Sequence, residues 1–426
     1  MDGHLCATMC RCQRSKNMFG KHIKPKIVIV GGGFAGLNAA QQLKSSRYDV
    51  SVIDPSPHIE WLPNIHEIIS GEKKGDELRL SRNILVRRLG HRFLMNRAME
   101  MTSSTVLLDN GMKVPFDVCI VATGSVNNTF GVEGADQFAL PMKSVDQCQV
   151  IARKLHRASL SHRTTRVTVV GGGIEGVEAF GEVMRAYRNR PQFEFNVVES
   201  SDHLMPNAPG HLDGKIRSHT EGFRVNYHLG KKVESVDHEG ICFMDGGAIE
   251  SDITIWSTGA APNSFLQRSY LTQDANEWAS VNQYFQSEAR ENVFIIGDAA
   301  SPEGRPLAKQ AFHAIDMGKA AAQNVERLLA NKALRQFQPS HKPQVVTFGD
   351  MDTFMLFRDF AVSSSVLGAA KEAVYTLGLL QMAPPKTAKD LVHSLDLLQR
   401  SARRVYLPTL NPLNLINKLP KSKVFS

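Results

Sequence analysis

The sequence predicts an α/β protein with two parallel sheets, each built around a glycine-rich turn, and a C-terminal α+β segment with an amphipathic helix. Two observations carry this prediction. Short apolar runs at 26–30 and 166–170, rich in β-branched residues, are each followed by the same glycine spacing and then by a helix-forming stretch. The 426 residues, 42% of them hydrophobic, also provide enough apolar surface for more than one core.

The first glycine-rich turn follows the run "KIVIV" and has the spacing G-x-G-x-x-G, in Gly31, Gly33 and Gly36. Gly31 permits the tight turn, Gly33 lets the backbone approach a pyrophosphate, and Gly36 lets the helix pack closely on the strand. The helix that follows, "LNAAQQLKSS", directs its free N–H groups at the phosphates, and Phe34 and Ala35 of the turn are further candidate cofactor-binding residues. This arrangement is typical of a Rossmann-like dinucleotide-binding domain.

The strand after this helix, "YDVSVID", ends in Asp54, 23 residues beyond Gly31. A carboxylate about 20 residues after the first glycine is where a Rossmann-like domain binds the ribose hydroxyls of a dinucleotide. Asp54 is therefore the predicted ribose ligand of the first domain.

The second turn repeats this pattern with Gly171, Gly173 and Gly176, and the next strand ends at Glu199. The interval of 28 residues is longer than usual because of the insertion "RNRPQ". A carboxylate at Glu199 accepts a hydrogen bond from a 2′-hydroxyl but repels a 2′-phosphate, which favours NADH over NADPH.

Two dinucleotide sites in one chain indicate that two dinucleotides meet, and we expect a flavin that stays bound and a nicotinamide that visits. The second domain is expected as an insertion in the first. The expected parts are a basic extension (1–25), a FAD domain (26–145 and 265–335), a NAD domain (146–264) and a C-terminal domain (340–426).

Strand-end turns downstream of each glycine turn extend the internal repeat over whole domains. The predicted members of these turns are Thr123, Gly124 and Gly259, and a third apolar strand ends in Gly297 and Asp298. A carboxylate at Asp298 can bind a ribityl hydroxyl, and the next helix, predicted over 307–329, can direct its N-terminus at the flavin pyrimidine ring. Taken alone, Asp298 is equally compatible with a helix cap.

This order of motifs over residues 26–329 resembles the superfamily of flavoproteins with two dinucleotide-binding domains, the pyridine-nucleotide oxidoreductases. Stretches such as "VIVGGGFAGL", "GGGIEGVEAFGE" and "NVFIIGDAA" are most similar to type II NADH dehydrogenases, with apoptosis-inducing-factor-like oxidoreductases as close relatives. The resemblance implies FAD at the first turn and NADH at the second. It also implies roles for Glu178 and Glu182, with Glu182 on the nicotinamide side; Glu178 is equally compatible with a helix-surface carboxylate.

The acceptor is the point at which the sequence departs from the family. Disulfide reductases of the superfamily use a cysteine pair, and this chain has none within the predicted domains, so we expect direct transfer from the flavin to an acceptor. Type II dehydrogenases carry the quinone motif Ala-Gln-x-Ala-x-Gln, where this chain has "AKQAFH", with Lys309 and His313 replacing the glutamines. We hypothesise that Lys309 stabilises negative charge at the flavin N1/O2 edge and that His313 donates a proton; a plain helix histidine is the alternative for His313.

The net charge of +8 is concentrated toward the two ends. From Lys386 onward there are eight Lys or Arg and two Asp, and a predicted helix there aligns Leu391, Leu395 and Leu398. A basic amphipathic helix is typical of a membrane-surface anchor, and packing on the protein's own body is the alternative. Residues 1–25 are compatible with a weak organelle-targeting peptide or a disordered extension.

The sequence thus predicts an FAD-dependent NADH dehydrogenase that reduces a quinone or a similar small acceptor at a peripheral membrane surface. The scattered cysteines favour a reducing compartment, either the cytoplasmic face or a mitochondrion. A homodimer is possible, whereas no metal site and no nucleic-acid partner are expected. The alternatives are a soluble oxidoreductase for another acceptor and an apoptosis-inducing-factor-like flavoprotein with slow turnover and a signalling role.

Overall fold

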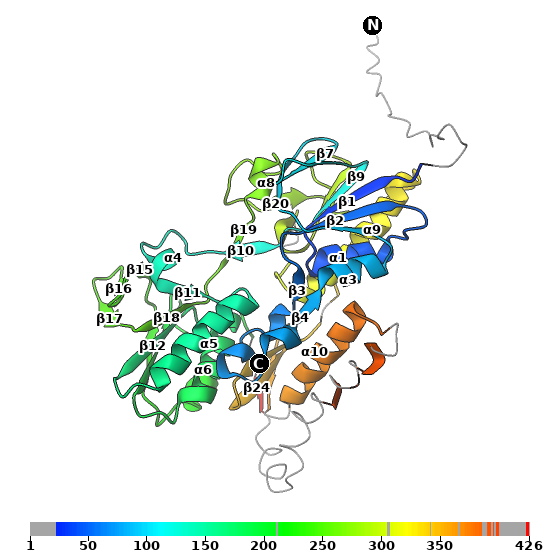
Figure 1. Cartoon of the computed structure of the whole chain (residues 1–426). Helices are drawn as coiled ribbons and strands as arrows, with labels where there is room; N and C mark the ends of the chain where they lie inside the picture. Colours follow the sequence, from blue (N-terminus) through cyan, green and yellow to red (C-terminus); the bar gives the residue numbers. More distant parts are fainter. Residues whose placement is uncertain are drawn as a thin grey trace. The chain divides into compact units, whose positions relative to one another are not determined.

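The computed structural model divides the chain into two compact units (Figure 1). The described residues are 23–209, 212–304, 307–340, 342–364, 367–385, 390–392, 395, 398–399 and 423–425. Unit 1 comprises Met1–Pro57, Arg82–Gly124 and Pro262–Pro339, and unit 2 comprises His58–Ser81, Ser125–Ala261 and Ser340–Ser426.

Unit 1 is built on a five-stranded sheet in the order β21-β9-β1-β2-β5, and every pairing in it is parallel. Its strands are β1 (Lys26–Val30), β2 (Asp49–Ile53), β5 (Arg92–Leu94), β9 (Val118–Val121) and β21 (Val293–Ile295). Its helices are α1 (Phe34–Gln42), α3 (Arg82–Arg88), α8 (Phe265–Arg268) and α9 (Ala311–Leu329). Four of the five β1 residues are buried because helices and loops cover both faces of the sheet.

Unit 2 has a second five-stranded parallel sheet, in the order β11-β18-β12-β13-β14. The strands are β11 (Ala139–Pro141), β12 (Thr165–Val170), β13 (Phe193–Glu199), β14 (Val225–Leu229) and β18 (Ile253–Trp256). The accompanying helices are α4 (Ala135–Phe138), α5 (Val145–Ser159), α6 (Ile174–Tyr187) and α7 (Asp213–Ser218).

The two sheets repeat each other element by element. In both, a central strand (β1 or β12) leads through a glycine turn into a helix and a parallel neighbour. Each unit also carries a three-stranded antiparallel meander. These are β6 (Ala98–Met101), β7 (Thr105–Leu108) and β8 (Lys113–Pro115) in unit 1, and β15 (Val233–Val236), β16 (Gly240–Phe243) and β17 (Ala248–Glu250) in unit 2. The α/β fold class with two Rossmann-like sheets is therefore confirmed.

In both glycine turns, the third glycine lies so close to the carbonyl oxygen of the first that no side chain fits. An added Cβ at Gly36 would lie 1.9 Å from the carbonyl oxygen of Gly31, and one at Gly176 would lie 1.7 Å from that of Gly171. The turns also need positive φ, which is +101° at Gly31 and +107° at Gly171. Each helix can therefore begin directly above the end of its strand.

Unit 2 also gathers segments that are distant in sequence. A hairpin of β3 (His58–Glu60) and β4 (Arg79–Ser81) encloses η1 (Leu62–Asn64), α2 (Glu67–Ser70) and η2 (Gly75–Leu78). The C-terminal part contributes β23 (Gln344–Phe348), β24 (Asp352–Leu356), β25 (Ala361–Ser363), β26 (Lys423–Phe425) and α10 (Gly368–Met382). Gly181 of α6 meets this part so closely that an added Cβ would lie 2.4 Å from the Gly349 nitrogen.

The two units group some segments of the chain differently from the expected domains. Residues 58–81 and 125–145, expected with the FAD domain, belong to unit 2, and so does the C-terminal segment. Strands β10 (Ser125–Asn127) and β19 (Ala260–Pro262) lie where the chain passes from one unit to the other.

Much of the two basic ends lies outside the described residues, including residues 1–22, Lys389, Arg400, Arg403 and Arg404. Leu391, Leu395 and Leu398 are described and exposed. Among the described residues, no helix has both the length and the apolar character that crossing a bilayer requires. The same residues contain no grouping of three or more His, Cys, Asp or Glu side chains suited to a metal ion.

The tight approach at Gly36 predicts that Gly36→Ala destabilises unit 1 by about 2 kcal/mol or more, because the new methyl group overlaps the Gly31 carbonyl. Gly214→Ala in the exposed part of α7 is the control, since no atom lies within 4 Å of a Cβ there, and we expect no loss of stability. Urea unfolding followed by circular dichroism measures both. Equal midpoints for the two variants would contradict the steric account.

Candidate active site

The first glycine turn presents an open backbone surface. Gly33 is the N-cap of α1, no side chain caps this helix end, and no atom lies within 4 Å of an added Cβ at Gly33. The first N–H groups of a helix have no partner within the helix. Phe34 and Ala35 form the first turn of α1. The start of α1 therefore has no side-chain cap and lies beside a surface that another molecule can approach, which suits an anionic phosphate.

Asp54 is tied to this turn by hydrogen bonds. Its Oδ2 accepts from the Gly32 N–H at 2.8 Å, and its Oδ1 accepts from the Ser56 N–H at 2.9 Å and from Arg82 Nη1 at 2.7 Å. A carboxylate has about four acceptor positions, so Asp54 keeps capacity for a ribose hydroxyl.

Arg82, the first residue of α3, is a site residue that the sequence did not indicate. It is buried, pairs with Asp54 and donates from Nε to the Gly32 carbonyl at 2.8 Å. It thus joins the Gly32 carbonyl of the glycine turn to the Asp54 carboxylate. An arginine 28 residues beyond Asp54 carries no recognisable spacing signal.

The Gly-Asp turn of η3 (Gly297–Ala299) lies at the start of α1. A Cβ at Gly297 would lie 3.1 Å from the Cβ of Ala35 and 3.7 Å from that of Ala314 in α9. The structure thus brings Gly297 and Asp298 to the first glycine turn. On the same unit, the Thr123 hydroxyl is buried and has no hydrogen-bond partner among the described residues, and Gly124 has positive φ. A buried hydroxyl without a partner beside an open glycine turn fits a bound dinucleotide.

Lys309 lies before α9 rather than within it. The sequence predicted a helix from about Leu307, whereas α9 begins at Ala311 after an extended Gln310. Lys309 Nζ donates to the Asp298 carbonyl at 2.6 Å and lies 3.3 Å from the centre of the Trp278 ring. Desolvation of the ammonium lowers the pKa of Lys309 to about 8, against the attraction of Asp298. His313 lies in the first turn of α9, with its ring 4.2 Å from that of Phe312.

The second glycine turn has the same construction in unit 2. Gly173 is the N-cap of α6, and an added Cβ there meets no atom within 4 Å. Glu199 Oε2 accepts from the Gly172 N–H at 2.6 Å, and its Oε1 accepts from the Ser201 N–H at 2.8 Å and from the Ser200 hydroxyl at 3.0 Å. The carboxylate at the end of β13 is thus held at the turn, as Asp54 is in unit 1.

The strand-end turn after β18 is also present in unit 2. Gly259 has a φ of +59°, and an added Cβ there would lie 2.4 Å from the ring of Phe130. At the other side of the turn, Trp256 Nε1 donates to the Asn128 carbonyl at 2.9 Å. The turn is therefore joined to the segment that follows β10.

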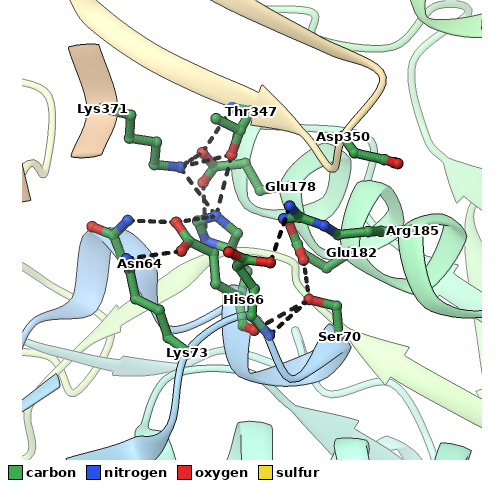
Figure 2. Close-up of polar contacts among 12 residues, drawn as sticks. Asn64, His66, Ser70, Lys73, Glu178, Glu182, Arg185, Thr347, Asp350 and Lys371 are labelled. Carbon is green, nitrogen blue, oxygen red and sulfur yellow. Dashed lines mark hydrogen bonds and ion pairs between the residues drawn. The ribbon is translucent and has the colours of Figure 1, made fainter. Parts of the chain in front are cut away.

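Helix α6 continues from the second glycine turn into a buried polar cluster within unit 2 (Figure 2). Glu178 is buried, which excludes the helix-surface alternative. It forms an ion pair with Lys371 of α10 and accepts from the Thr347 N–H of β23 at 3.2 Å. Burial raises the pKa of Glu178, and Lys371 opposes that rise.

His66 completes this part of the cluster as a neutral imidazole. Burial first, and then the charge of Lys371, hold its pKa well below the ordinary value. Its Nε2 accepts from Lys371 Nζ at 3.0 Å, and its Nδ1 lies 3.5 Å from Glu178 Oε2. Because Nε2 accepts from an ammonium and Nδ1 faces a carboxylate, the ring proton is assigned to Nδ1.

Glu182, one turn further along α6, is 1% exposed. Its carboxylate accepts from the Ser70 hydroxyl of α2 and from Arg185 Nη1 at 3.4 Å. Burial raises the pKa of Glu182 to about 7, against the attraction of Arg185 and the hydrogen bond from Ser70. The predicted nicotinamide-side residue is thus a carboxyl group that gains and loses a proton near neutral pH.

A third group of buried charges extends the cluster between α2 and α10. Lys73 is fully buried, and its ammonium lies 2.6 Å from Glu372 Oε2 and 3.3 Å from Glu67 Oε2. The ring of Tyr375 covers it at 4.2 Å. The sequence did not indicate Lys73 or Lys371, because Glu372 and Glu178, which pair with them, lie 299 and 193 residues away in the chain.

The described cysteines are unpaired. Cys119 in β9 and Cys148 in α5 are buried, Cys242 in β16 is partly buried, and no disulfide links them. Burial raises the pKa of the Cys119 and Cys148 thiols. Both are therefore poor nucleophiles.

With this geometry established, comparison with known families identifies the chain. The family model of pyridine nucleotide-disulphide oxidoreductases matches residues 25–318. The chain therefore belongs to the pyridine nucleotide-disulphide oxidoreductase family, as the order of its motifs predicted, and it is an oxidoreductase.

Relatives agree with the resemblance to type II NADH dehydrogenases. A type II NADH:quinone oxidoreductase of Mycobacterium tuberculosis is 28% identical over 361 residues, covering 76% of this chain and 77% of the relative. An alternative NAD(P)H-ubiquinone oxidoreductase of Arabidopsis thaliana is 24% identical over 410 residues, covering 84% and 78%. The predicted resemblance is confirmed.

Solved structures agree on the fold. The NDH2 structure from Plasmodium falciparum in complex with NADH has a TM-score of 0.77 and 16% identity, covering 90% of this chain and 99% of that chain. A sulfide:quinone oxidoreductase from Aquifex aeolicus has a TM-score of 0.73 and 16% identity, covering 84% and 91%.

Glu182 predicts a dependence of stability on pH. Because its carboxyl holds a proton to about pH 7 in the folded chain but ionises from about 4.5 when unfolded, it destabilises the fold as pH rises through this window. Glu182→Gln removes this titrating carboxyl group. The free energy of unfolding of the wild type should therefore fall relative to that of the variant between about pH 4.5 and 7, by at most roughly 3 kcal/mol. Urea midpoints of both proteins from pH 4.5 to 8 measure the difference. A difference that is constant with pH would contradict the assignment.

Proposed function

We propose that this oxidoreductase is an FAD-dependent NADH dehydrogenase that passes electrons directly to a quinone. The observation that carries the proposal is the duplicated site: two uncapped glycine turns, open at Gly33 and Gly173, each next to a strand-end carboxylate. One dinucleotide for each turn is the arrangement that a resident flavin and a visiting nicotinamide require. The names of the relatives from M. tuberculosis and A. thaliana support NADH and quinone as substrates.

FAD is assigned to unit 1. Its pyrophosphate would meet the turn residues Gly31, Gly33, Phe34, Ala35 and Gly36, and its adenosine ribose would meet Asp54, which Arg82 holds in place. The Thr123 hydroxyl, Gly124, Gly297 and Asp298 would contact the rest of the molecule. A bound FAD would supply two-electron chemistry, taking a hydride from NADH and passing the electrons on singly or as a pair.

NADH is assigned to unit 2, at Gly171, Gly173, Gly176 and Gly259. Glu199 is held at the turn by backbone N–H groups and would select the ribose, because its negative charge repels a 2′-phosphate. Among the Glu199 hydrogen bonds in the described part of the chain, none comes from an arginine that would bind such a phosphate. This arrangement supports NADH over NADPH.

Glu182 and Glu178 are the side chains of unit 2 that we assign to the nicotinamide side and to its support. Glu182 can hold or release a proton near neutral pH, with Ser70 as its hydrogen-bond donor. Glu178, paired with Lys371, fixes α6 to α10. These residues position the visiting nucleotide and hold charge in a site sheltered from water, and no protein nucleophile is needed.

Direct reduction of the acceptor is supported by the cysteines, since those that are described are unpaired. Lys309 and His313 remain the candidates for contact with the flavin edge and with the acceptor. Lys309 Nζ lies at the Asp298 carbonyl, where a cation would stabilise negative charge on the ring system.

Purified protein tests the proposal through its flavin spectrum and through oxidation of NADH and NADPH with a quinone, ferricyanide and oxygen. We expect bound FAD, a preference for NADH, and fast turnover with quinone.

Gly33→Ala should lose FAD and Gly173→Ala should raise the KM for NADH at least tenfold with FAD retained, because each methyl group occupies the open surface of its turn. Folded protein without flavin would overturn the proposal, and slow turnover with a long-lived NAD complex would favour a signalling flavoprotein.

We propose that the protein lies at a membrane surface, because a quinone dissolved in the bilayer would be bound there. Val374 and Leu377 of α10 are exposed, as are Leu391, Leu395 and Leu398. We expect the triple variant Leu391→Glu, Leu395→Glu and Leu398→Glu to lose most sedimentation with anionic liposomes while keeping FAD. Leu160→Glu is the control, because Leu160 is exposed at the end of α5. Undiminished binding of the triple variant would contradict the anchor.

A further inference from the structure

Lys309 is held at its place by a residue from a different part of unit 1. Its ammonium lies 3.3 Å from the centre of the Trp278 indole ring and 2.6 Å from the Asp298 carbonyl oxygen. A cation over an indole face is attracted by the negative face of the ring, and indole is the strongest of the aromatic partners. The ammonium therefore has a partner on two sides although Lys309 as a residue is exposed.

The backbone explains how the indole reaches this place. Trp278 directly precedes β20 (Ala279–Val281), which pairs in parallel with β22 (Ala300–Pro302), the strand that follows η3. Because Ala279 pairs with Ala300, Trp278 lies one residue before that pair, beside the turn that carries Asp298. The β20–β22 pairing thus places the indole ring beside the turn that carries Asp298, where the ring contacts the Lys309 ammonium.

We propose that Trp278 is a positioning residue that holds the Lys309 ammonium at the Asp298 carbonyl, so that the cation acts on the bound flavin from a fixed place. The inference rests on the proposed function for the presence of FAD in unit 1. A free lysine has a long, flexible stem, and its effect on a cofactor is averaged over many rotamers. The indole removes this averaging, so Trp278 contributes to the flavin only through Lys309.

A double-mutant cycle tests this dependence in the full-length, FAD-loaded protein, with Trp278→Ala, Lys309→Gln and the double variant. Midpoint potentials are measured by photoreduction with a reference dye and without NADH. We expect each single variant to lower the potential to a similar extent, because a nearby cation favours the electron-rich flavin, and the double variant to fall no further. Trp278→Phe should restore part of the loss, since it keeps an aromatic face. Tyr270→Ala, which removes an exposed ring from the same unit, should leave the potential unchanged.

A second readout does not depend on the flavin. In protein labelled with 13C-lysine, the Lys309 Cε–Hε resonance should be shifted upfield by the indole ring current, and it is assigned by its absence from Lys309→Gln. The shift should vanish in Trp278→Ala and persist in Tyr270→Ala. In turnover, Trp278→Ala and Lys309→Gln should each lower kcat/KM for the acceptor about three- to tenfold.

Two results would overturn the inference: a Lys309 resonance that Trp278→Ala leaves in place, or a potential that Trp278→Ala lowers equally when Lys309 is already glutamine. Wild-type protein that binds FAD but does not oxidise NADH would instead refute the proposed function. Because the potential and the resonance are measured without NADH, that failure leaves the test of Trp278 intact.

Discussion

The close approach of a helix to a glycine turn is the constraint on which both units depend. In each unit the third glycine lies against the carbonyl oxygen of the first, at a distance that no Cβ can occupy. This contact places the helix N-terminus directly after the central strand and leaves the second glycine facing open space. The same contact also brings the middle N–H of the turn to a strand-end carboxylate, Asp54 in one unit and Glu199 in the other. Packing and ligand geometry are therefore consequences of one steric fact.

Helix α6 links two kinds of chemistry within unit 2. Its first turn forms part of the nucleotide-binding surface, and its middle carries Glu178 and Glu182 into a cluster of buried charges. A buried charge without a partner is strongly destabilising, so each carboxylate there is paired or hydrogen-bonded, as Figure 2 shows. Glu182 accepts from the Ser70 hydroxyl and lies 3.4 Å from an arginine, and burial raises its pKa to about 7. The same helix thus carries the nucleotide site and a titrating carboxyl group.

The sequence predicted the elements whose signals are local. The glycine spacings, the apolar strands and the strand-end carboxylates are dictated by backbone sterics, which act over a few residues, and the structure contains them in both units. Its predictions were weaker where a side chain depends on distant partners. Arg82 and Lys371 gave no local signal, because their partners Asp54 and Glu178 lie 28 and 193 residues away. The start of α9 was also misplaced, because the segment at Lys309 is held by Asp298 and Trp278 rather than by its own helix propensity.

The pairing of Lys73 with Glu372 has a consequence for the biosynthesis of the protein. These residues are 299 positions apart, and the Lys73 ammonium is wholly enclosed in the finished fold. At roughly 5–20 residues per second, a ribosome needs roughly 15–60 s to deliver the partner carboxylate. Before Glu372 is made, a buried Lys73 ammonium would have Glu67 as its single carboxylate partner. The hairpin of residues 58–81 therefore gains its full stabilisation only late in translation. Completion of unit 2 is therefore a late or post-translational event, whereas its central sheet can form as soon as residue 256 has emerged.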